Sequence, residues 1–452
     1  MCTNFVNRCC AVLEIVTVQS PAEVHGLVAS ISGMTLQVRG VVSLARIGDR
    51  LTLCPAHAPG VAMEVVGFTG DVTEALAFGA LDHIGHGCRV AAALPPRPAS
   101  VCVTDHLLGR IIDPAGLPLD GGPPLPTNGV RRRIDAPPLP AASRDRLGRR
   151  LHFGIRALDM FLPMQQGQRL GIFAGSGVGK STLLASLAEA SVCDVAVIAL
   201  VGERGREVRE FVEDILGSDG LARAVVVVAT SDLPPMIRRD AALAATTIAE
   251  YFRNAGRHVL LLIDSITRFA MALREIALSG GEAPGLRGYP PSVLSALPRL
   301  LERPGPGVRG QAGSITALLT VLVEADDVND PIADAIRSIL DGHIVLDRRL
   351  AERGSFPPID VLRSISRTAA QCAGRRETAL ARRARGILAL SDELSDLVRL
   401  GAYRPGTDPK ADEALRLAPA IRDLIQQPHG APAEQRSPLD ILETLFGGEA
   451  NA

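Results

Sequence analysis

Between residues 165 and 365, the hydrophobic positions form short continuous runs that alternate with helical patterns. Five runs are predicted strands: 169–173, 195–200, 224–229, 259–263 and 315–323. Unbroken apolar runs such as 224–229 are typical of strands that are buried on both faces. Their alternation with helical segments predicts a parallel α/β sheet.

The pattern before this region differs. Residues 22–95 contain short runs separated by glycine turns, at 26–31, 34–38, 50–53 and 61–68, and this spacing predicts a small β-barrel. In residues 1–20 the apolar positions recur at helical spacing, so a short amphipathic helix and a frayed tail are equally good interpretations.

Residues 113–150 are rich in Pro, Gly and Arg, which favours a solvated linker over a basic contact patch.

The end of the chain is predicted to be helical. Two sets of apolar residues each share one helical face: Ile387, Leu390, Leu394, Leu397, Val398 and Leu400, and further on Leu417, Ile421, Leu424 and Ile425. Ser437 and Pro438 are a typical N-cap and first position of a last helix.

Composition narrows the class of protein. The 452 residues are 47% hydrophobic with a net charge of −1 and no Trp, which argues against a nonspecific nucleic-acid binder. The eight cysteines form no C-x-x-C pair and suit a reducing compartment. The sequence has no apolar run of about 18 residues and no signal-peptide pattern, so we expect a cytoplasmic protein.

The strand predicted at 169–173 leads into a glycine-rich segment, 174–181, that opens onto a predicted helix. Backbone N–H groups in such a loop, together with the helix N-terminus, bind phosphate. Lys180 can reach the β- and γ-phosphates, and the Ser181 hydroxyl can ligate Mg²⁺. A turn that precedes a lysine by chance is disfavoured, because the strand and helix stand where phosphate binding needs them. The expected nucleotide contacts are Gly175, Ser176, Gly177, Val178, Gly179, Lys180, Ser181 and Thr182.

Two carboxylates follow predicted strands. Asp264 comes directly after 259–263 and Glu203 follows 195–200, so both are expected at the carboxyl edge of the sheet, where ligands bind. Asp264 is then expected to hold Mg²⁺ or its waters, and Glu203 to orient or deprotonate the attacking water. The adjacent Arg204 is expected to tune the charge of the Glu203 carboxylate or to bind phosphate. The alternatives are a helix cap at Asp264 and a surface ion pair between Glu203 and Arg204.

Long motifs in a fixed order extend the pattern, and all of them can be read directly from the sequence: 171–181, 201–208, 262–270, 288–293, 313–317, 326–334, 340–346 and 400–403 with 408–409. Together they resemble the catalytic subunits of the rotary ATPase superfamily and, more narrowly, the type III export ATPases. The resemblance covers about residues 25–445.

This resemblance implies roles for single residues. Lys180 and Ser181 match the ligands of MgATP, Glu203 the water-activating glutamate, and Asp264 the metal-associated aspartate. Arg367, in 364–367, matches an arginine finger that acts on the nucleotide of the neighbouring subunit.

The resemblance also implies two further contacts. Phe356 stands where an aromatic packs on adenine, with a core phenylalanine as the alternative. Asp326, Asp327 and Asp330 match a loop that faces the central hole of a ring, although capping of the next helix explains them equally well.

Four parts are therefore expected: an N-terminal partner-binding segment (1–20), a β-barrel domain (21–95), a RecA-like P-loop ATPase domain (96–370) and a C-terminal helical domain (371–452). The implied activity is MgATP hydrolysis by a homohexamer that assists export through the flagellar type III apparatus. Implied partners are a regulator or stator at the N-terminus, a coiled-coil shaft, and export chaperones and substrates. Peripheral association with the membrane export gate is also implied, and no nucleic-acid partner is expected.

Four alternatives remain. The ATPase of a virulence injectisome uses the same chemistry, and neighbouring genes would separate the two. A non-catalytic ring subunit would be expected to lack Lys180 or Glu203. An RNA-dependent hexameric helicase would need a basic, aromatic N-terminal module, whereas the first 95 residues hold only three aromatics. A true rotary synthase would need a companion subunit and would not be expected to have an export-type C-terminus.

Overall fold

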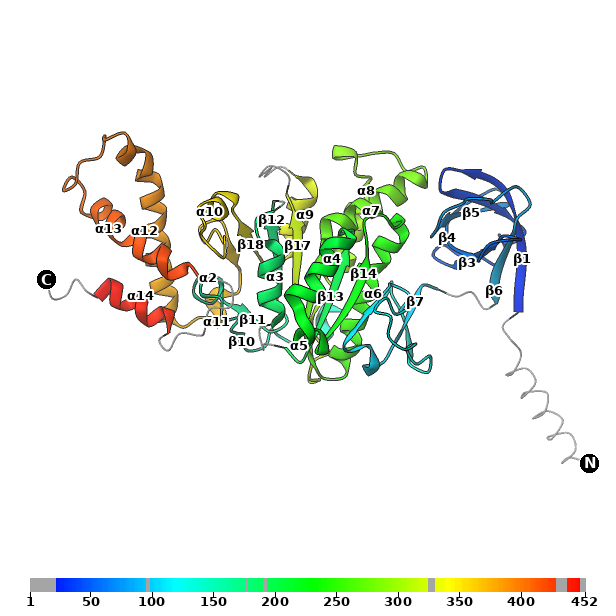
Figure 1. The fold of residues 1–452 in the computed structure, drawn as a ribbon, viewed down its shortest axis with the longest axis horizontal. Coiled ribbons are helices and arrows are strands. Elements are labelled where there is room, and N and C mark those ends of the chain that lie inside the picture. Colours follow the sequence, from blue (N-terminus) through cyan, green and yellow to red (C-terminus); the bar gives the residue numbers. More distant parts are fainter. Residues whose placement is uncertain are drawn as a thin grey trace, which may run out of the picture.

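The computed structural model describes residues 22–94, 98–175, 177–189, 193–323, 330–427 and 437–447. Three bodies lie in a row along the long axis (Figure 1): a barrel, a sheet flanked by helices, and a group of C-terminal helices. This is the predicted fold class. The helix considered for residues 1–20 lies outside the described residues.

The N-terminal body is a closed six-stranded barrel in the order β1-β2-β5-β4-β3-β6. Side chains that alternate along these strands, including Leu36, Val38, Leu53 and Met63, fill its interior. The strands are β1 (Ala22–Ser32), β2 (Thr35–Arg39), β3 (Arg50–Cys54), β4 (Val61–Thr69), β5 (Val72–Ala77) and β6 (Arg89–Leu94).

The central body is a nine-stranded sheet whose main path runs β19-β18-β12-β17-β15-β13-β14-β8, with β16 beside β17. The strands from β18 to β8 pair in parallel; β19 is an antiparallel edge strand, and β16 pairs antiparallel with the start of β17. The five predicted strands correspond to β12 (Arg169–Ala174), β13 (Val195–Val201), β14 (Ala224–Ala229), β15 (His258–Asp264) and β17 (Ser314–Leu322). The others are β8 (Arg110–Ile112), β16 (Gly305–Pro306), β18 (Gly342–Leu346) and β19 (Ile365–Ser366).

Helices cover both faces of this sheet. One apolar core joins the sheet to α6, α7, α8 and α9, and the other joins it to α3 and the C-terminal helices. The bounds are α3 (Lys180–Glu189), α4 (Gly205–Glu210), η3 (Phe211–Leu216), α5 (Gly217–Ala222), α6 (Pro235–Asn254), α7 (Ile266–Ser279), η4 (Leu286–Gly288), α8 (Pro291–Leu301), α9 (Pro331–Ile339) and α10 (Arg348–Glu352).

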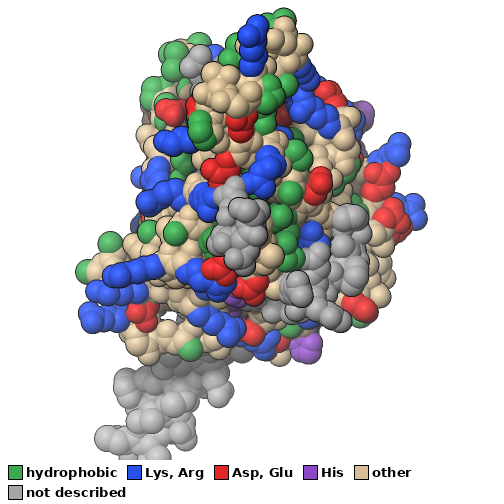
Figure 2. Space-filling view, turned by 90° about the vertical axis from the view of Figure 1, so that its left-hand side faces the viewer, with side chains coloured by type: hydrophobic (Ala, Val, Ile, Leu, Met, Phe, Trp, Pro, Cys, Tyr) green, Lys and Arg blue, Asp and Glu red, His purple; other side chains and the backbone are tan. Residues whose placement is uncertain are grey.

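The C-terminal body packs against the sheet through its own apolar side chains. The predicted helical faces are buried at Ile387, Leu417 and Ile421, and α12, α13 and α14 contact α2. The prediction was wrong for the last turns of α12 and the residue after it, where Leu397, Val398 and Leu400 are exposed. Figure 2 shows the face of the molecule at this end, where basic side chains are scattered among acidic and apolar ones. The helices are α2 (Arg156–Phe161), α11 (Ala369–Cys372), α12 (Arg375–Arg399), α13 (Pro409–Ile425) and α14 (Pro438–Gly447).

The Pro-rich segment between the barrel and the sheet is partly structured. Within it, β9 (Val130–Arg133) pairs with β7 (Ser100–Val103), although the β9 arginines 131 and 133 remain exposed. The short elements nearby are η1 (Asp105–Leu107), η2 (Ala141–Ser143), β10 (Arg150–Leu151) and β11 (Met164–Gln165).

A buried ion-pair cluster joins the barrel to α6. Arg239 donates from Nη1 to Glu64 in β4 at 2.8 Å and from Nη2 to its neighbour Asp240 at 2.6 Å. Arg50, in β3, pairs with the same two carboxylates. Two arginines and two acids therefore balance in charge at the contact between the two bodies.

Candidate functional site

The glycine-rich loop has the backbone that its sequence predicts. It leaves β12 after Ala174 and enters α3 at Lys180. Gly177 and Gly179 have φ of +75° and +90°, a left-handed conformation that residues with a Cβ rarely adopt. The side chain of Val178 is 2% exposed and anchors the loop in the apolar core. Ser176 lies outside the described residues.

The Lys180 ammonium lies between two carboxylates. Its Nζ atom is 2.6 Å from Asp264 Oδ1 and 3.4 Å from Glu203 Oε1. The two acids meet because β15 and β13 are parallel neighbours, with Asp264 in register with Leu200. The side chains of Lys180 and Glu203 are each only 12% exposed. The structure thus brings these three predicted site residues together at the carboxyl edge of the sheet.

Asp264 does not cap the helix that follows it. Ser265 has that role, since its hydroxyl accepts from the backbone N–H of Arg268 at 3.2 Å. Asp264 Oδ1 instead accepts from Lys180 and, at 2.7 Å, from the hydroxyl of Thr320 in β17. Thr320 was not predicted, although a buried threonine in the apolar run 315–323 is a usable signal.

Burial and neighbouring charge set the protonation of this group. Burial is the main cause that raises the pKa of Glu203 to about 7, and the charge of Asp264 adds to it while Lys180 opposes it. Burial also works to lower the pKa of Lys180, but Asp264 and Glu203 outweigh it and leave that pKa raised. A lysine that stays charged beside a carboxyl that titrates near neutrality suits phosphate binding and proton transfer.

Arg204 lies apart from this group. Its side chain is 80% exposed, and its guanidinium is 3.6 Å from Glu207 on α4. Glu207, on α4, also raises the pKa of Glu203, through a hydrogen bond and through its negative charge.

Phe356 lies beside the glycine-rich loop. A Cβ atom added to Gly179 would be 3.9 Å from its ring. The side chain is 46% exposed, so it is not a core residue. An open aromatic face next to the loop suits stacking on a planar base.

Arg367 directly follows β19, which pairs with the sheet through β18. Its side chain is exposed, and its Nη2 atom donates to the carbonyl of Arg337 in α9 at 3.3 Å. It therefore lies at a sheet edge that is open to another molecule.

The acidic loop can be described only at its end. Asp326 and Asp327 lie outside the described residues. Asp330 accepts from the backbone N–H groups of Ile332 and Ala333 at 2.7 and 3.2 Å, so it caps α9.

Within the described ranges, we find no cluster of three or more His, Cys, Asp or Glu side chains that could hold a metal ion. The oxygen donors beside the loop are the hydroxyls of Ser181 and Thr182, exposed in the first turn of α3, and Asp264. In the same part of the chain, no helix is both long enough and apolar enough to span a membrane.

A left-handed glycine loop, a buried lysine and two carboxylates at the carboxyl edge of a parallel sheet define a P-loop nucleoside triphosphatase. Comparison with known families agrees. Residues 154–366 match the nucleotide-binding domain of the ATP synthase alpha/beta family, and residues 373–444 match the T3SS EscN ATPase C-terminal domain.

Individual relatives cover nearly the whole chain. The flagellum-specific ATP synthase of Caulobacter vibrioides is 48% identical over 90% of this chain and 92% of its own length. The type 3 secretion system ATPase of Xanthomonas euvesicatoria is 45% identical over 93% and 94%. The assembled ATPase EscN of enteropathogenic E. coli superimposes with a TM-score of 0.84 at 40% identity, covering 93% of this chain and 99% of EscN. The chain belongs to the family of flagellum-specific ATP synthases and type III secretion ATPases, and it is an ATPase.

Proposed function

We propose that this chain hydrolyses MgATP in a homohexameric ring and assists protein export through a flagellar type III apparatus. The observation that carries the proposal is the Lys180 ammonium held between Asp264 and Glu203 behind the glycine-rich loop. Lysine, aspartate and glutamate in this arrangement supply the phosphate ligand, the metal support and the water-positioning group of ATP hydrolysis.

The donor set fits Mg²⁺, which prefers oxygen ligands and commonly binds through one or two protein groups plus phosphates. Ser181 and Asp264 would hold the ion, and the ion would neutralise charge on the phosphates. Backbone N–H groups of residues 175–182 would bind the phosphates, and Phe356 would pack on adenine.

Glu203 would take the proton of the attacking water. A pKa of about 7 suits this role, because a general base works best when its pKa is near the working pH. Arg204 would act only through its neighbours, since its side chain lies in solvent.

Arg367 would act in trans on the γ-phosphoryl group bound by an adjacent subunit. Its exposure at the sheet edge supports this assignment, and such arginines contribute about 10³–10⁵ in rate. A ring of identical chains would then hold one active site at each interface.

The partner proposals rest on relatives. EscN is known assembled and in complex with its central stalk EscO, and we infer a comparable coiled-coil shaft here. A regulator or stator would bind residues 1–20, and chaperones and export substrates would be further partners. We infer a cytoplasmic protein at the inner face of the inner membrane, peripherally associated with the export gate.

Mixed assembly tests the shared site. Arg367→Ala should keep ATP binding but hydrolyse about 10³-fold more slowly or worse, and Glu203→Ala should also be inactive. Mixing these two variants should restore measurable turnover, because some interfaces then combine an intact Glu203 with an intact Arg367.

A mixture of Lys180→Ala and Glu203→Ala is the matched control. Both changes lie on the same side of an interface, so this mixture should stay inactive. If size measurements show that the Arg367→Ala and Glu203→Ala variants co-assemble and turnover is still not recovered, the trans arrangement is refuted.

The second candidate is the ATPase of a virulence injectisome. The 45% identity to a type 3 secretion system ATPase favours it nearly as much. Genes for flagellar structural proteins beside this gene would support the first assignment, and injectisome genes would support the second.

A further inference from the structure

The side chain of Gln168, directly before β12, is completely buried and bonded at both ends of its amide. Its Nε2 group donates to the Ser366 hydroxyl at 3.1 Å, and its Oε1 atom accepts from the Thr368 hydroxyl at 2.8 Å. Oε1 also accepts from the backbone N–H of Gln165 at 2.9 Å. Ser366 and Thr368 are the two residues on either side of Arg367, so a single amide holds both.

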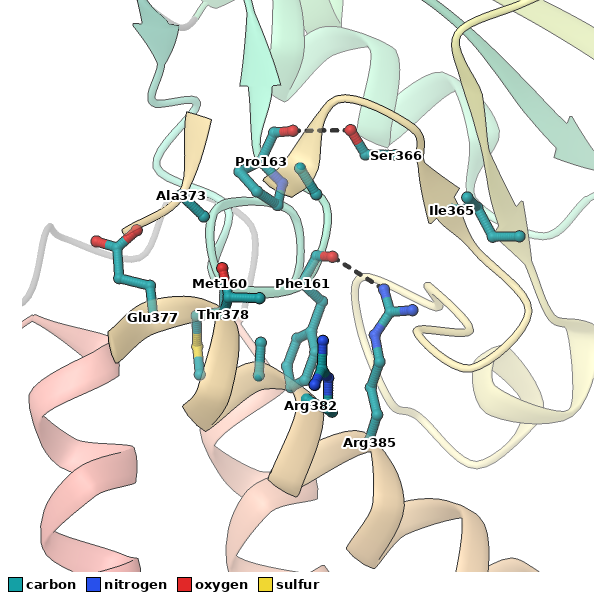
Figure 3. A pocket seen from close by; sticks show the side chains of 12 residues that line it. Met160, Phe161, Pro163, Ile365, Ser366, Ala373, Glu377, Thr378, Arg382 and Arg385 are labelled. Atoms are coloured by element: carbon teal, nitrogen blue, oxygen red, sulfur yellow. Dashed lines mark hydrogen bonds between the residues drawn. The ribbon is translucent and has the colours of Figure 1, made fainter. Parts of the chain in front are cut away.

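Other contacts fix the same short segment. The Ser366 hydroxyl donates to the carbonyl of Pro163 at 2.9 Å (Figure 3), and the backbone N–H of Arg367 donates to the carbonyl of Asp341 at 2.9 Å. Arg367 and Thr368 form a turn directly after β19. The Ser366 and Thr368 hydroxyls on either side are held inward by the amide, while the Arg367 side chain between them is exposed.

The amide also ties this segment to the chain's own nucleotide loop. Gln168 immediately precedes β12, and β12 ends at Ala174, where the loop begins. Asp341, whose carbonyl holds Arg367, also accepts from Arg169 Nε in β12 at 3.2 Å.

A second link lies at the other end of the strand. The Arg337 guanidinium lies 4.8 Å from the ring centre of Phe173, the residue before Ala174. The carbonyl of the same Arg337 accepts from Arg367. The arginine segment is therefore fixed to both ends of the strand that leads to the loop.

We propose that Gln168 is a positioning residue for phosphoryl transfer: its amide sets Arg367 by holding Ser366 and Thr368, and it joins each subunit's nucleotide loop to the arginine offered to the next subunit. The proposal rests on the role of Arg367 in the proposed function. Placement errors of about 1 Å cost near 10²-fold in rate, so losing the amide should misplace the guanidinium enough to be measured.

The test uses Gln168→Met and Thr368→Val in the full assembled chain. Methionine keeps the length of the side chain without its hydrogen bonds, and valine removes only the Thr368 hydroxyl. Each should lower kcat, about 10- to 100-fold for Gln168→Met, and leave the KM for ATP unchanged. Thr246→Val is the matched control, because the buried Thr246 hydroxyl donates to the carbonyl of Ala242 in the same helix; this change should leave kcat unchanged.

Binding of nucleotide analogues separates positioning from folding. Both variants should bind ADP with aluminium fluoride more weakly, since that complex resembles the transition state, and should bind a non-hydrolysable ATP analogue normally. A raised KM, or a lowered melting temperature with kcat intact, would mean that the amide only stabilises the fold and would overturn the proposal.

Double variants separate this inference from the proposed function. In an Arg367→Ala background, Thr368→Val should cause no further loss, and an independent loss in that background would overturn the proposal. If Arg367→Ala is inactive while Gln168→Met and Thr368→Val hydrolyse ATP normally, the inference alone fails. If Arg367→Ala hydrolyses ATP normally, the trans assignment and this inference fail together.

Discussion

Lys180 separates two acids that would otherwise repel each other. It lies 2.6 Å from Asp264 and 3.4 Å from Glu203, and the three side chains are largely buried. The sequence could predict these residues because Asp264 and Glu203 stand at or just after the end of an apolar strand, and Lys180 opens a helix. Thr320 and Gln168 could not be found in the same way, since their partners come from strands distant in the sequence.

The protonation of Glu203 makes the rate depend on pH. A base must be ionised to accept a proton, so kcat/KM should rise about tenfold per pH unit below the raised pKa of about 7 and level off above it. Glu203→Gln should lose about 10²–10⁴ of the rate and this pH dependence with it. A flat profile for the unmodified protein between about pH 5.5 and 8 would contradict the assignment.

The raised pKa of Glu203 also makes the stability of the fold depend on pH. The pKa of this acid is higher in the folded chain than its ordinary value of 4.5. Its contribution to stability is therefore fully present below about pH 4.5 and declines as the pH rises through about 7. At about pH 8, Glu203→Gln should then melt at a higher temperature than the unmodified protein. If the difference in melting temperature between the two proteins is the same at about pH 4.5 and at about pH 8, the raised pKa is refuted.

At the scale of elements, the strands with continuous apolar runs were predictable and the short ones were not. The buried strand β14 has the same bounds, Ala224–Ala229, as the apolar run that predicted it. Strand β19, in contrast, has two residues and exists because Gly342, with φ of +155°, lets the carbonyl of Ile365 approach its backbone. Pairings of this kind depend on contacts distant in sequence, so local pattern does not predict them.

The contact between the barrel and α6 also depends on distant residues. Arg239→Met should leave Glu64 and Asp240 with one arginine instead of two, and it should lower stability by about 3–5 kcal/mol, as breaking a buried ion pair does. Chemical denaturation would measure the change. Arg206→Met, at an exposed i,i+4 pair with Glu210, is the control and should have no measurable effect.

At the scale of the whole molecule, activity should depend on assembly. With Arg367 exposed at one edge and Lys180 behind the loop, a lone chain would lack one part of each site. Specific ATPase activity should therefore rise steeply with protein concentration as rings form, with light scattering measured in parallel. A constant specific activity from monomers would mean that each subunit is self-sufficient.

The ion-pair cluster between the barrel and α6 has a mechanical consequence. Arg239 and Arg50 fix the barrel to the sheet with charged groups that are costly to separate. A barrel held in this way should move with its sheet as one rigid unit. Any rotation of the sheet during turnover would then be carried into the barrel, with no hinge between them to absorb it.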